Sequence, residues 1–540
     1  MRILWSCVAV GLEISVFVGH TAAVQSIISL DYATYQGTST SDGISQWLGI
    51  RYAAPPLGHL RFSAPEDPDT VDDVQQADQH GPTCLATGAS STDTSTSEDC
   101  LFLDVYAPSN ATSDSKLPVF FWIQGGGFNS NSNANYNGRG LITASGMNMV
   151  VVTFNYRVGP YGFLASQEVL QDGSVNNGLK DQIKALKWVQ KYIKQFGGDP
   201  EHVVVGGASA GAASVTFLLT AYGGRDDGLF HATAAESQSF GTMYTVSQSQ
   251  FMYDNLVIRT NCASSADTLA CLRSLNASTL QDYNFNSPYP GAQGAPLYMY
   301  SVTIDGDMVP DYTYRLFAEG KIIKVPTIFG DDLNGGTIFA PKNTNTIGDS
   351  DVFQHNQFPA LTLSQVRSLN QLYPVEGTPE FPGAGRYWRQ ASDSYGQMRY
   401  TCPGLFCSTS LSDDCGIPSW NYLYSVHDPT SDANGYGVSH TIEVNAIFGP
   451  NNTNGGAPAS YYTSNAGVVP VIQGYWTSFI RSYDPNKYRL PGTPKWERWN
   501  GAEQPRLVFN TGGNVTVNAV DNVTRERCSY LNNIGVSVKQ

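Results

Sequence analysis

Short apolar runs alternate with segments of helical spacing in the first half of the chain. Residues 101–108, 118–124 and 149–157 are rich in β-branched and aromatic residues, which is typical of strands buried inside a sheet. Residues 177–196 carry apolar side chains at helical spacing and stop at two glycines, a common end for a helix. Strands that alternate with helices predict a mostly parallel sheet covered on both faces.

The next stretch, residues 196–212, reads FGGDPEHVVVGGASAGA and predicts a strand, a sharp turn and a helix. Three consecutive valines form the strand, and Ser209 stands at the turn. Glycine and alanine flank the serine on both sides, and only such small neighbours tolerate the cramped backbone of this turn. The turn exposes the hydroxyl and directs the following amides at a reacting oxygen. In a chain with 53 glycines, the pentapeptide alone is equally compatible with a glycine-rich loop that opens a helix.

Further strand-like runs occur at residues 231–236, 325–330 and 420–426. No proline-rich or serine-rich linker and no internal repeat divides the chain, so we expect residues 24–540 to form a single domain. The hydrophobic fraction of 41% is enough for a large core. The net charge of −15 argues against nucleic acid and anionic membranes as partners.

Residues 1–23 begin with Met-Arg, continue with an apolar run and end in HTAA. This order predicts a secretory signal peptide that is cleaved near Ala23, and hence a secreted protein. The alternative is an N-terminal membrane anchor, which the short run and its interruption by Glu13 disfavour. No other segment of the sequence is long and apolar enough to span a bilayer. Five glycosylation sequons agree with secretion, at Asn110, Asn276, Asn451, Asn514 and Asn522.

The chain has nine cysteines, and removal of Cys7 with the signal peptide leaves eight. An even number of cysteines in a secreted protein predicts disulfides, here four of them. No cysteine lies beside a histidine as a nucleophile would. No spacing indicates a metal site or a dinucleotide-binding motif, so we expect no cofactor and no metal.

These motifs together resemble the type-B carboxylesterase/lipase family, the cholinesterase-related branch of the α/β-hydrolases. Residues 98–105 (EDCLFLDV) match one family signature and residues 196–211 match a second. The segments GIRYAAPPLGHLRF, NYRVGPYGFL and NGLKDQIKALKWV match as well, and the likeness runs from about Val24 to the C-terminus, nearest to secreted fungal members. The resemblance implies an α/β-hydrolase fold: a mostly parallel central sheet with helices on both faces and large insertions.

The resemblance also implies serine chemistry, with Ser209 as the nucleophile. A serine hydroxyl needs a base to remove its proton, and His440 in GVSHTIE matches the family's base and its place in the chain order. Charge that builds on the former carbonyl oxygen needs preorganised amide donors. By position in the family, Gly126, Gly127 and Ala210 supply this oxyanion hole.

The acid of the triad is missing from its family position. The family carries it in a G-x-x-x-x-E-G-x-x-F segment, where this chain has Gly335. Candidate replacements are Glu236 at the end of the strand candidate 231–236, Asp332 on the same loop as Gly335, and Glu443 three residues after His440. Three interpretations stay open. One of these carboxylates serves, or His440 works without a carboxylate at a much reduced rate, or the chain is an inactive member that binds a ligand.

Residues 85–99 bear on the substrate. In lipases of the family this loop is a long amphipathic lid, and in cholinesterases it carries aromatic residues. Here it is short, polar and free of aromatic residues, so it offers neither an apolar flap nor a cation–π platform. We expect hydrolysis of soluble small-molecule esters or lactones through an acyl-Ser209 intermediate. The alternatives are a catalytically impaired binding protein and an acyltransferase.

The resemblance also implies how the cysteines pair. Three pairs follow the family pattern, and the last two cysteines are left to form an extra short bridge: Cys84–Cys100, Cys262–Cys271, Cys402–Cys528 and, as the extra pair, Cys407–Cys415.

Overall fold

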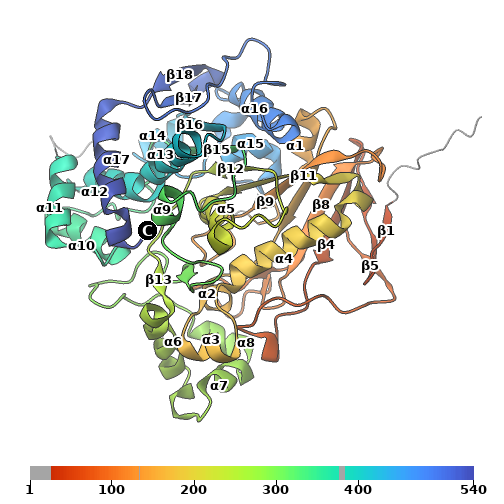
Figure 1. The fold of residues 1–540 in the computed structure, drawn as a ribbon, viewed down its shortest axis with the longest axis horizontal. Helices are drawn as coiled ribbons and strands as arrows, with labels where there is room; N and C mark the ends of the chain where they lie inside the picture. The colour runs from red at the N-terminus through yellow and green to blue at the C-terminus, as the bar shows by residue number, and fades with distance from the viewer. Residues whose placement is uncertain (1–25, 133, 376–382) are drawn as a thin grey trace, which may run out of the picture.

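The computed structural model describes residues 26–132, 134–375 and 383–540. The signal peptide predicted at residues 1–23 lies outside these described residues. The described chain is built around one large sheet, with helices packed against it (Figure 1).

Eleven strands of the described chain form the sheet, in the order β18-β17-β16-β15-β12-β11-β9-β10-β8-β4-β3. The strands from β10 to β17 in this order are parallel, and antiparallel pairs stand at both edges. The expected α/β fold with a mostly parallel sheet is therefore confirmed. The bounds are β3 (Thr38–Ser39), β4 (Ile44–Arg51), β8 (Phe102–Pro108), β9 (Leu117–Ile123), β10 (Val150–Phe154), β11 (Gly198–Ala208), β12 (Ala232–Glu236), β15 (Thr327–Asp332), β16 (Ser419–Ser425), β17 (Pro505–Asn510) and β18 (Val515–Ala519).

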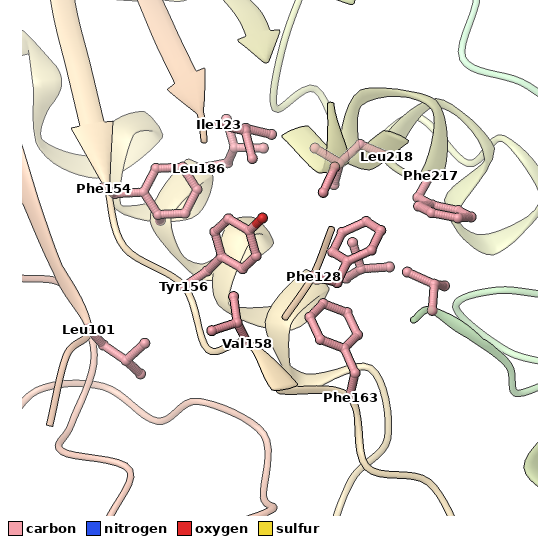
Figure 2. Close-up of a cluster of buried hydrophobic side chains, with 14 of the residues drawn as sticks. Leu101, Ile123, Phe128, Phe154, Tyr156, Val158, Phe163, Leu186, Phe217 and Leu218 are labelled. Carbon is pink, nitrogen blue, oxygen red and sulfur yellow. The ribbon is translucent and has the colours of Figure 1, made fainter. Parts of the chain in front are cut away.

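Side chains of the central strands alternate between two apolar layers. Phe121 and Ile123 of β9 enter a cluster with α4 (Asn177–Tyr192) and α5 (Ala210–Thr220). Their neighbour Trp122 enters a second cluster with α1 (Arg139–Ala144), α15 (Val444–Phe448) and α16 (Val468–Ser482). Figure 2 shows the first layer, where Ile123 lies with Leu186 of α4 and Leu218 of α5. This period-two alternation requires helices on both faces of the sheet.

Two further groups of helices are inserted between the strands of the sheet in the sequence. One group forms a third apolar cluster, to which α10 (Ile347–Gln357), α11 (Leu363–Leu372), α12 (Trp388–Gly396), α13 (Cys402–Thr409) and α17 (Asn522–Ile534) contribute. The other gathers at the lower edge in Figure 1, with α3 (Gln167–Asp172), α6 (Val246–Arg259), α7 (Thr268–Ser274) and α8 (Ala277–Asp282). The remaining α-helices of the described chain are α2 (Gly159–Phe163), α9 (Thr313–Ala318) and α14 (Pro429–Ala433).

Three of the four predicted disulfides are present: Cys84–Cys100, Cys262–Cys271 and Cys402–Cys528. The predicted bridge between Cys407 and Cys415 is wrong, because both are free thiols. Helical backbone runs without a break from α13 through residues 410–414. Eight residues of helix separate the two α-carbons by roughly 12 Å, which exceeds the reach of a disulfide.

The cysteine pairs should differ in how much they stabilise the fold. Cys402–Cys528 closes a separation of 126 residues, whereas Cys262–Cys271 closes one of 9. By chain entropy the long loop stabilises by about 5 kcal/mol and the short one by about 2.5 kcal/mol. Replacing both cysteines of the long pair by serine should lower the melting temperature more than the same change in the short pair. Calorimetry of the two double variants checks this, and equal losses would contradict it.

The asparagines of the five predicted glycosylation sequons are all exposed, so the fold leaves them accessible; their occupancy stays a prediction. Among the described residues, no helix is long and apolar enough to cross a membrane.

Candidate active site

Ser209 lies at the turn between β11 and α5, as its sequence predicts. Its backbone has φ 58° and ψ −120°, a strained conformation for a residue with a side chain. A Cβ on Gly207 would lie 2.7 Å from the carbonyl carbon of Gly211, and one on Gly211 would lie 2.0 Å from Ile123 O. The flanking glycines are therefore required, because α5 starts directly against the end of β9. Ser209 remains half-buried, while most of its neighbours are buried.

The glycine-rich loop after β9 turns sharply beside this serine. Gly126 and Gly127 have φ of 115° and 61°, and the carbonyl of Gly126 accepts hydrogen bonds from the backbone amides of Asn129 and Ser130, both at 3.0 Å. The carbonyl of Gly126 is therefore bonded within the turn. This is the arrangement expected of a loop whose backbone amides bind a ligand. Ala210, the third predicted member of the oxyanion hole, is the first residue of α5, where backbone amides have no partner within the helix.

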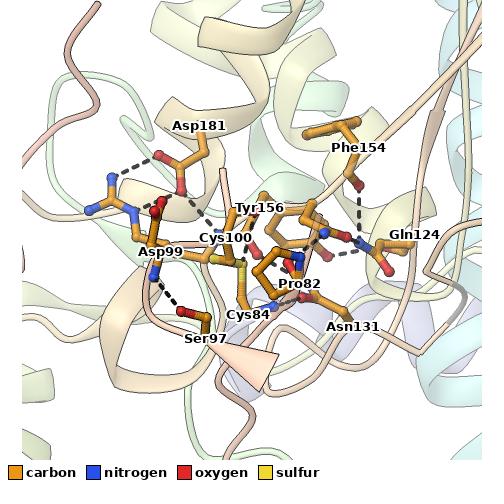
Figure 3. The surroundings of a disulfide bond; sticks show 12 residues. Pro82, Cys84, Ser97, Asp99, Cys100, Gln124, Asn131, Phe154, Tyr156 and Asp181 are labelled. Atoms are coloured by element: carbon orange, nitrogen blue, oxygen red, sulfur yellow. Dashed lines mark hydrogen bonds and ion pairs between the residues drawn. A yellow bond between two sulfur atoms is a disulfide. The ribbon is translucent and has the colours of Figure 1, made fainter. Parts of the chain in front are cut away.

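Gln124 holds the loop from behind. Its Nε2 donates to Phe154 O at 3.0 Å and to Asn155 Oδ1 at 2.9 Å. Tyr156 Oη donates to the backbone carbonyl of Gln124 at 2.9 Å. Figure 3 shows this network next to the Cys84–Cys100 disulfide, with Asn131 bonded to the amide of Cys84 at 2.9 Å. The disulfide loop is thereby fastened to the chain that follows the glycine loop.

His440 lies between β16 and α15 with only 6% of its surface exposed. Tyr400 stacks on the imidazole with the ring centres 4.1 Å apart, and Phe339 meets its edge at 5.4 Å. Its buried Nε2 has no hydrogen-bond partner among the described residues. The ring is thus positioned by aromatic contacts.

The end of β12 brings Ser209 and the His440 loop to the same edge of the sheet. The amide of Ser209 donates to Glu236 O at 3.1 Å. The next residue, Ser237, accepts a hydrogen bond at Oγ from the amide of Thr441 at 3.2 Å. Two adjacent residues at the end of β12 therefore bond to the two parts of the site: Glu236 to Ser209, and Ser237 to Thr441, which follows His440.

Glu236 does not contact the imidazole. It is fully buried, and its carboxylate accepts from Gly207 N at 3.0 Å and from Trp476 Nε1 at 2.7 Å. Burial raises the pKa of Glu236 to about 8. The residue therefore supports the strand before the turn.

Asp332 and Glu443 form a second buried group and do not bond to His440 either. Asp332 Oδ2 accepts from Thr441 N at 2.8 Å, and Glu443 Oε1 accepts from Tyr422 Oη at 2.8 Å. Ser237 Oγ lies 2.6 Å from Asp332 Oδ2 and 2.7 Å from Glu443 Oε1, and it donates its one proton to either of them. Burial raises the pKa of both carboxyls, and the negative charge of Glu443 raises that of Asp332 further. Both carboxyls anchor the loop that follows His440.

Tyr400 also borders Gly335, the position where the family carries the acid. A Cβ on Gly335 would lie 3.5 Å from Tyr400 Cδ2 and 3.6 Å from Asp332 O, which is ordinary van der Waals contact. Phe339 is the last residue of the segment that matches the family's G-x-x-x-x-E-G-x-x-F pattern. Tyr400 carries no spacing signal, and the contact of both rings with the imidazole follows only from the packing. Tyr400 lies two residues before Cys402 of the predicted Cys402–Cys528 disulfide, the nearby feature that could have drawn attention to it.

Burial and the nearby positive charge of Arg399 lower the pKa of His440 to about 3. No carboxylate among the described residues counteracts this shift. The neutral imidazole can accept a proton, but no carboxylate among the described residues bonds to the ring to stabilise an imidazolium. In the described chain, the candidate site therefore contains Ser209, His440 and the glycine-rich loop, without a carboxylate on the imidazole.

This shift predicts an unusual pH dependence. A general base must be neutral to act, and a lowered pKa keeps His440 neutral on acidification. For a neutral ester, kcat/KM should stay nearly constant from pH 7 to about pH 5, where an ordinary histidine of pKa about 6.5 would lose roughly 30-fold. Initial rates across this range check it. A fall with a midpoint near pH 6.5 would contradict the lowered pKa.

Comparison with known proteins places the chain among ester hydrolases. The model of the carboxylesterase family matches residues 25–531. "Secreted lipase 4" of Gibberella zeae is 29% identical, over 95% of this chain and 94% of that protein. "Lipase 4" of Diutina rugosa is 32% identical, over 89% of this chain and 92% of that protein. The crystal structure of Aspergillus niger EstA matches with a TM-score of 0.92 and 42% identity, over 96% of this chain and 99% of that one. The chain belongs to the carboxylesterase family.

Proposed function

We propose that this protein is a secreted serine esterase that hydrolyses carboxylic esters through an acyl-Ser209 intermediate. The observation that carries the proposal is the strained backbone of Ser209, with φ 58° and ψ −120°, at the end of a buried parallel strand. Strain of this kind persists only where the surrounding structure imposes it, and it is typical of nucleophile turns. The relatives named secreted lipases and the three disulfides support secretion.

In the proposed reaction, Ser209 Oγ bonds to the ester carbonyl carbon as its proton passes to His440. The amides of Gly126, Gly127 and Ala210 bind the oxyanion. When the intermediate collapses, the C–O bond to the alcohol breaks, and the proton on His440 goes to the leaving oxygen. Water then attacks the acyl group, again with His440 as the base, and releases the acid and free Ser209. His440 performs both transfers without a carboxylate partner.

The proposed substrates are soluble esters, although several relatives are named lipases. The loop between Cys84 and Cys100 is polar and mostly exposed or half-exposed, and a disulfide closes it at its base. Such a loop has no apolar surface to open onto a lipid interface. We therefore expect no rise in activity at the surface of an emulsified triglyceride.

A second candidate function is ligand binding with little or no catalysis. The absence of a carboxylate on His440 among the described residues favours it. An acyltransferase, in which an alcohol replaces water in the second step, would share the acyl-Ser209 intermediate.

Hydrolysis of the 4-nitrophenyl esters of acetate, butyrate, octanoate and laurate tests the proposal, together with labelling by an organophosphate. We expect turnover that favours the short soluble esters, and stoichiometric phosphorylation of Ser209. Added alcohols that divert the acyl group would point to the transferase. No turnover and no labelling would leave the binding protein.

A further inference from the structure

A buried arginine next to the proposed active site has no counter-charge within the described part of the chain. Arg399 belongs to the π-helical segment Gln397–Thr401 between α12 and α13, and it is 9% exposed. Short π-helical segments often mark functional sites. The next residue, Tyr400, stacks on His440. The positive charge of Arg399 is close enough to lower the pKa of His440.

The other buried arginines of the described chain show what is missing. Four arginines are buried there, and three of them bond a buried carboxylate: Arg61 with Glu98, Arg157 with Asp181, and Arg506 with Asp331. Arg399 has no such partner among the described residues. Its one side-chain hydrogen bond there runs from Nε to Ser239 Oγ at 3.2 Å. A buried charge without a counter-ion is costly.

Two tyrosine rings pack around this guanidinium. Its carbon lies 5.5 Å from the ring centre of Tyr298 and 5.9 Å from that of Tyr395. Tyr298 in turn packs on the glycine-rich loop after β9, since a Cβ on Gly127 would lie 2.2 Å from Tyr298 Cδ1. Tyrosine rings attract a cation but do not neutralise it. Arg399 therefore contacts the glycine loop through Tyr298 and directly precedes Tyr400, which stacks on His440. Both of its terminal amino groups are unbonded among the described residues.

We propose that Arg399 binds a free carboxylate of the substrate, so that the preferred substrates are esters that carry a second, anionic group. This inference rests on the proposed function of the same site. Arginine suits the role, because its planar guanidinium binds a carboxylate through two parallel hydrogen bonds.

The bound carboxylate would also act on catalysis. It places a negative charge beside the positive charge that disfavours the imidazolium of His440. The substrate thereby contributes part of the electrostatic effect that the absent triad acid would give. The preference for an anionic ester should consequently appear in kcat as well as in KM.

Matched pairs of esters test the proposal. Mono-4-nitrophenyl glutarate and 4-nitrophenyl valerate differ by a carboxylate on the acyl side. The pair 4-acetoxybenzoate and 4-methylphenyl acetate differs by one on the alcohol side. After subtraction of the uncatalysed rate, we expect kcat/KM at least tenfold higher for the anionic member of one pair, and that pair identifies the side that faces Arg399. A wild type that favours the neutral member in both pairs would overturn the proposal.

Variants assign the preference to the residue. Arg399→Gln should reduce the anionic-to-neutral ratio to about one or below, while Arg399→Lys, which keeps the charge, should retain part of it. Arg481→Gln is the matched control: Arg481 also lies over a tyrosine, 4.0 Å from the ring centre of Tyr488. It lies near the opposite end of β11, because His202 at that end bonds to Ile480 O. A ratio that survives in Arg399→Gln, or falls equally in Arg481→Gln, would overturn the assignment.

A binding measurement separates this inference from the proposed function. Calorimetric titration of Ser209→Ala with glutarate or 4-hydroxybenzoate should detect binding that Ser209→Ala/Arg399→Gln lacks. Binding without any ester turnover in the wild type would refute the esterase and support the anion site. Turnover of neutral esters without binding of either anion would do the reverse.

Discussion

Gly335→Glu is expected to raise kcat on a neutral ester by about 100-fold, although it changes a residue that contacts no substrate in our account. Removal of the acid from a complete triad lowers kcat by about 10⁴-fold, and we expect a restored carboxylate to recover part of that factor. The new charge would stabilise the imidazolium of His440, which has no carboxylate partner among the described residues.

The backbone at position 335 can accept the side chain. A Cβ there would make only van der Waals contact, at 3.5 Å from Tyr400 and 3.6 Å from Asp332 O. The glycine does not have a positive φ, so a larger residue adds no backbone strain. Its carboxylate would also raise the pKa of His440, so the acid limb of the pH profile should move up from its low position.

Two variants of the same position control for shape. Gly335→Gln has the size of glutamate without its charge, and Gly335→Ala reports the effect of the Cβ alone. Both should stay within a few-fold of the wild type. An equal rise in Gly335→Gln and Gly335→Glu would show that packing is responsible, and no rise in any variant would contradict the view that a missing carboxylate limits the rate.

Ser209→Ala is expected to lower kcat by about 100-fold in the wild-type background and by about 10⁴-fold in the Gly335→Glu background. Triad members act as a unit, so removal of the serine costs less where the acid is already absent. The two losses together form a double-mutant cycle in which the serine and the new glutamate are strongly coupled. Steady-state rates of the four proteins give the coupling directly.

Additive effects of the two substitutions on kcat would contradict the predicted coupling. If Ser209→Ala cost the same factor in both backgrounds, the glutamate would be acting somewhere other than on the serine–histidine pair. Melting temperatures of the four proteins serve as the control, since a buried charge at position 335 could act through stability alone.

Much of the central sheet is readable from the sequence because its strands are continuous apolar runs. The run at residues 149–157 corresponds to β10 (Val150–Phe154), and the run at residues 420–426 corresponds to β16. The two strands after β16 were not predicted. β17 (Pro505–Asn510) is a buried inner strand, but it starts with a proline. β18 (Val515–Ala519) is an edge strand without a buried residue, and it lacks the buried pattern that identifies a strand.

The candidate site likewise has one part that the sequence predicts and another that it does not. The turn at Ser209 is encoded locally by the small residues around it, and the structure has it as predicted. The partners of Glu236 and Asp332 could not be predicted, because Trp476 and Thr441 reach them from distant parts of the chain. The missed role of Arg399 has the same origin: whether a charge is paired depends on packing that no motif records.

The most direct test of the account is to trap the acyl-enzyme. The wild type would be mixed with 4-nitrophenyl acetate, quenched in acid within the first turnovers, digested and analysed by mass spectrometry. Because His440 must also activate water without a carboxylate partner, we expect deacylation to be slow and the acetyl group to accumulate on Ser209, with none in Ser209→Ala. Acetylation of another residue, or turnover without any acetylated serine, would contradict the proposed mechanism.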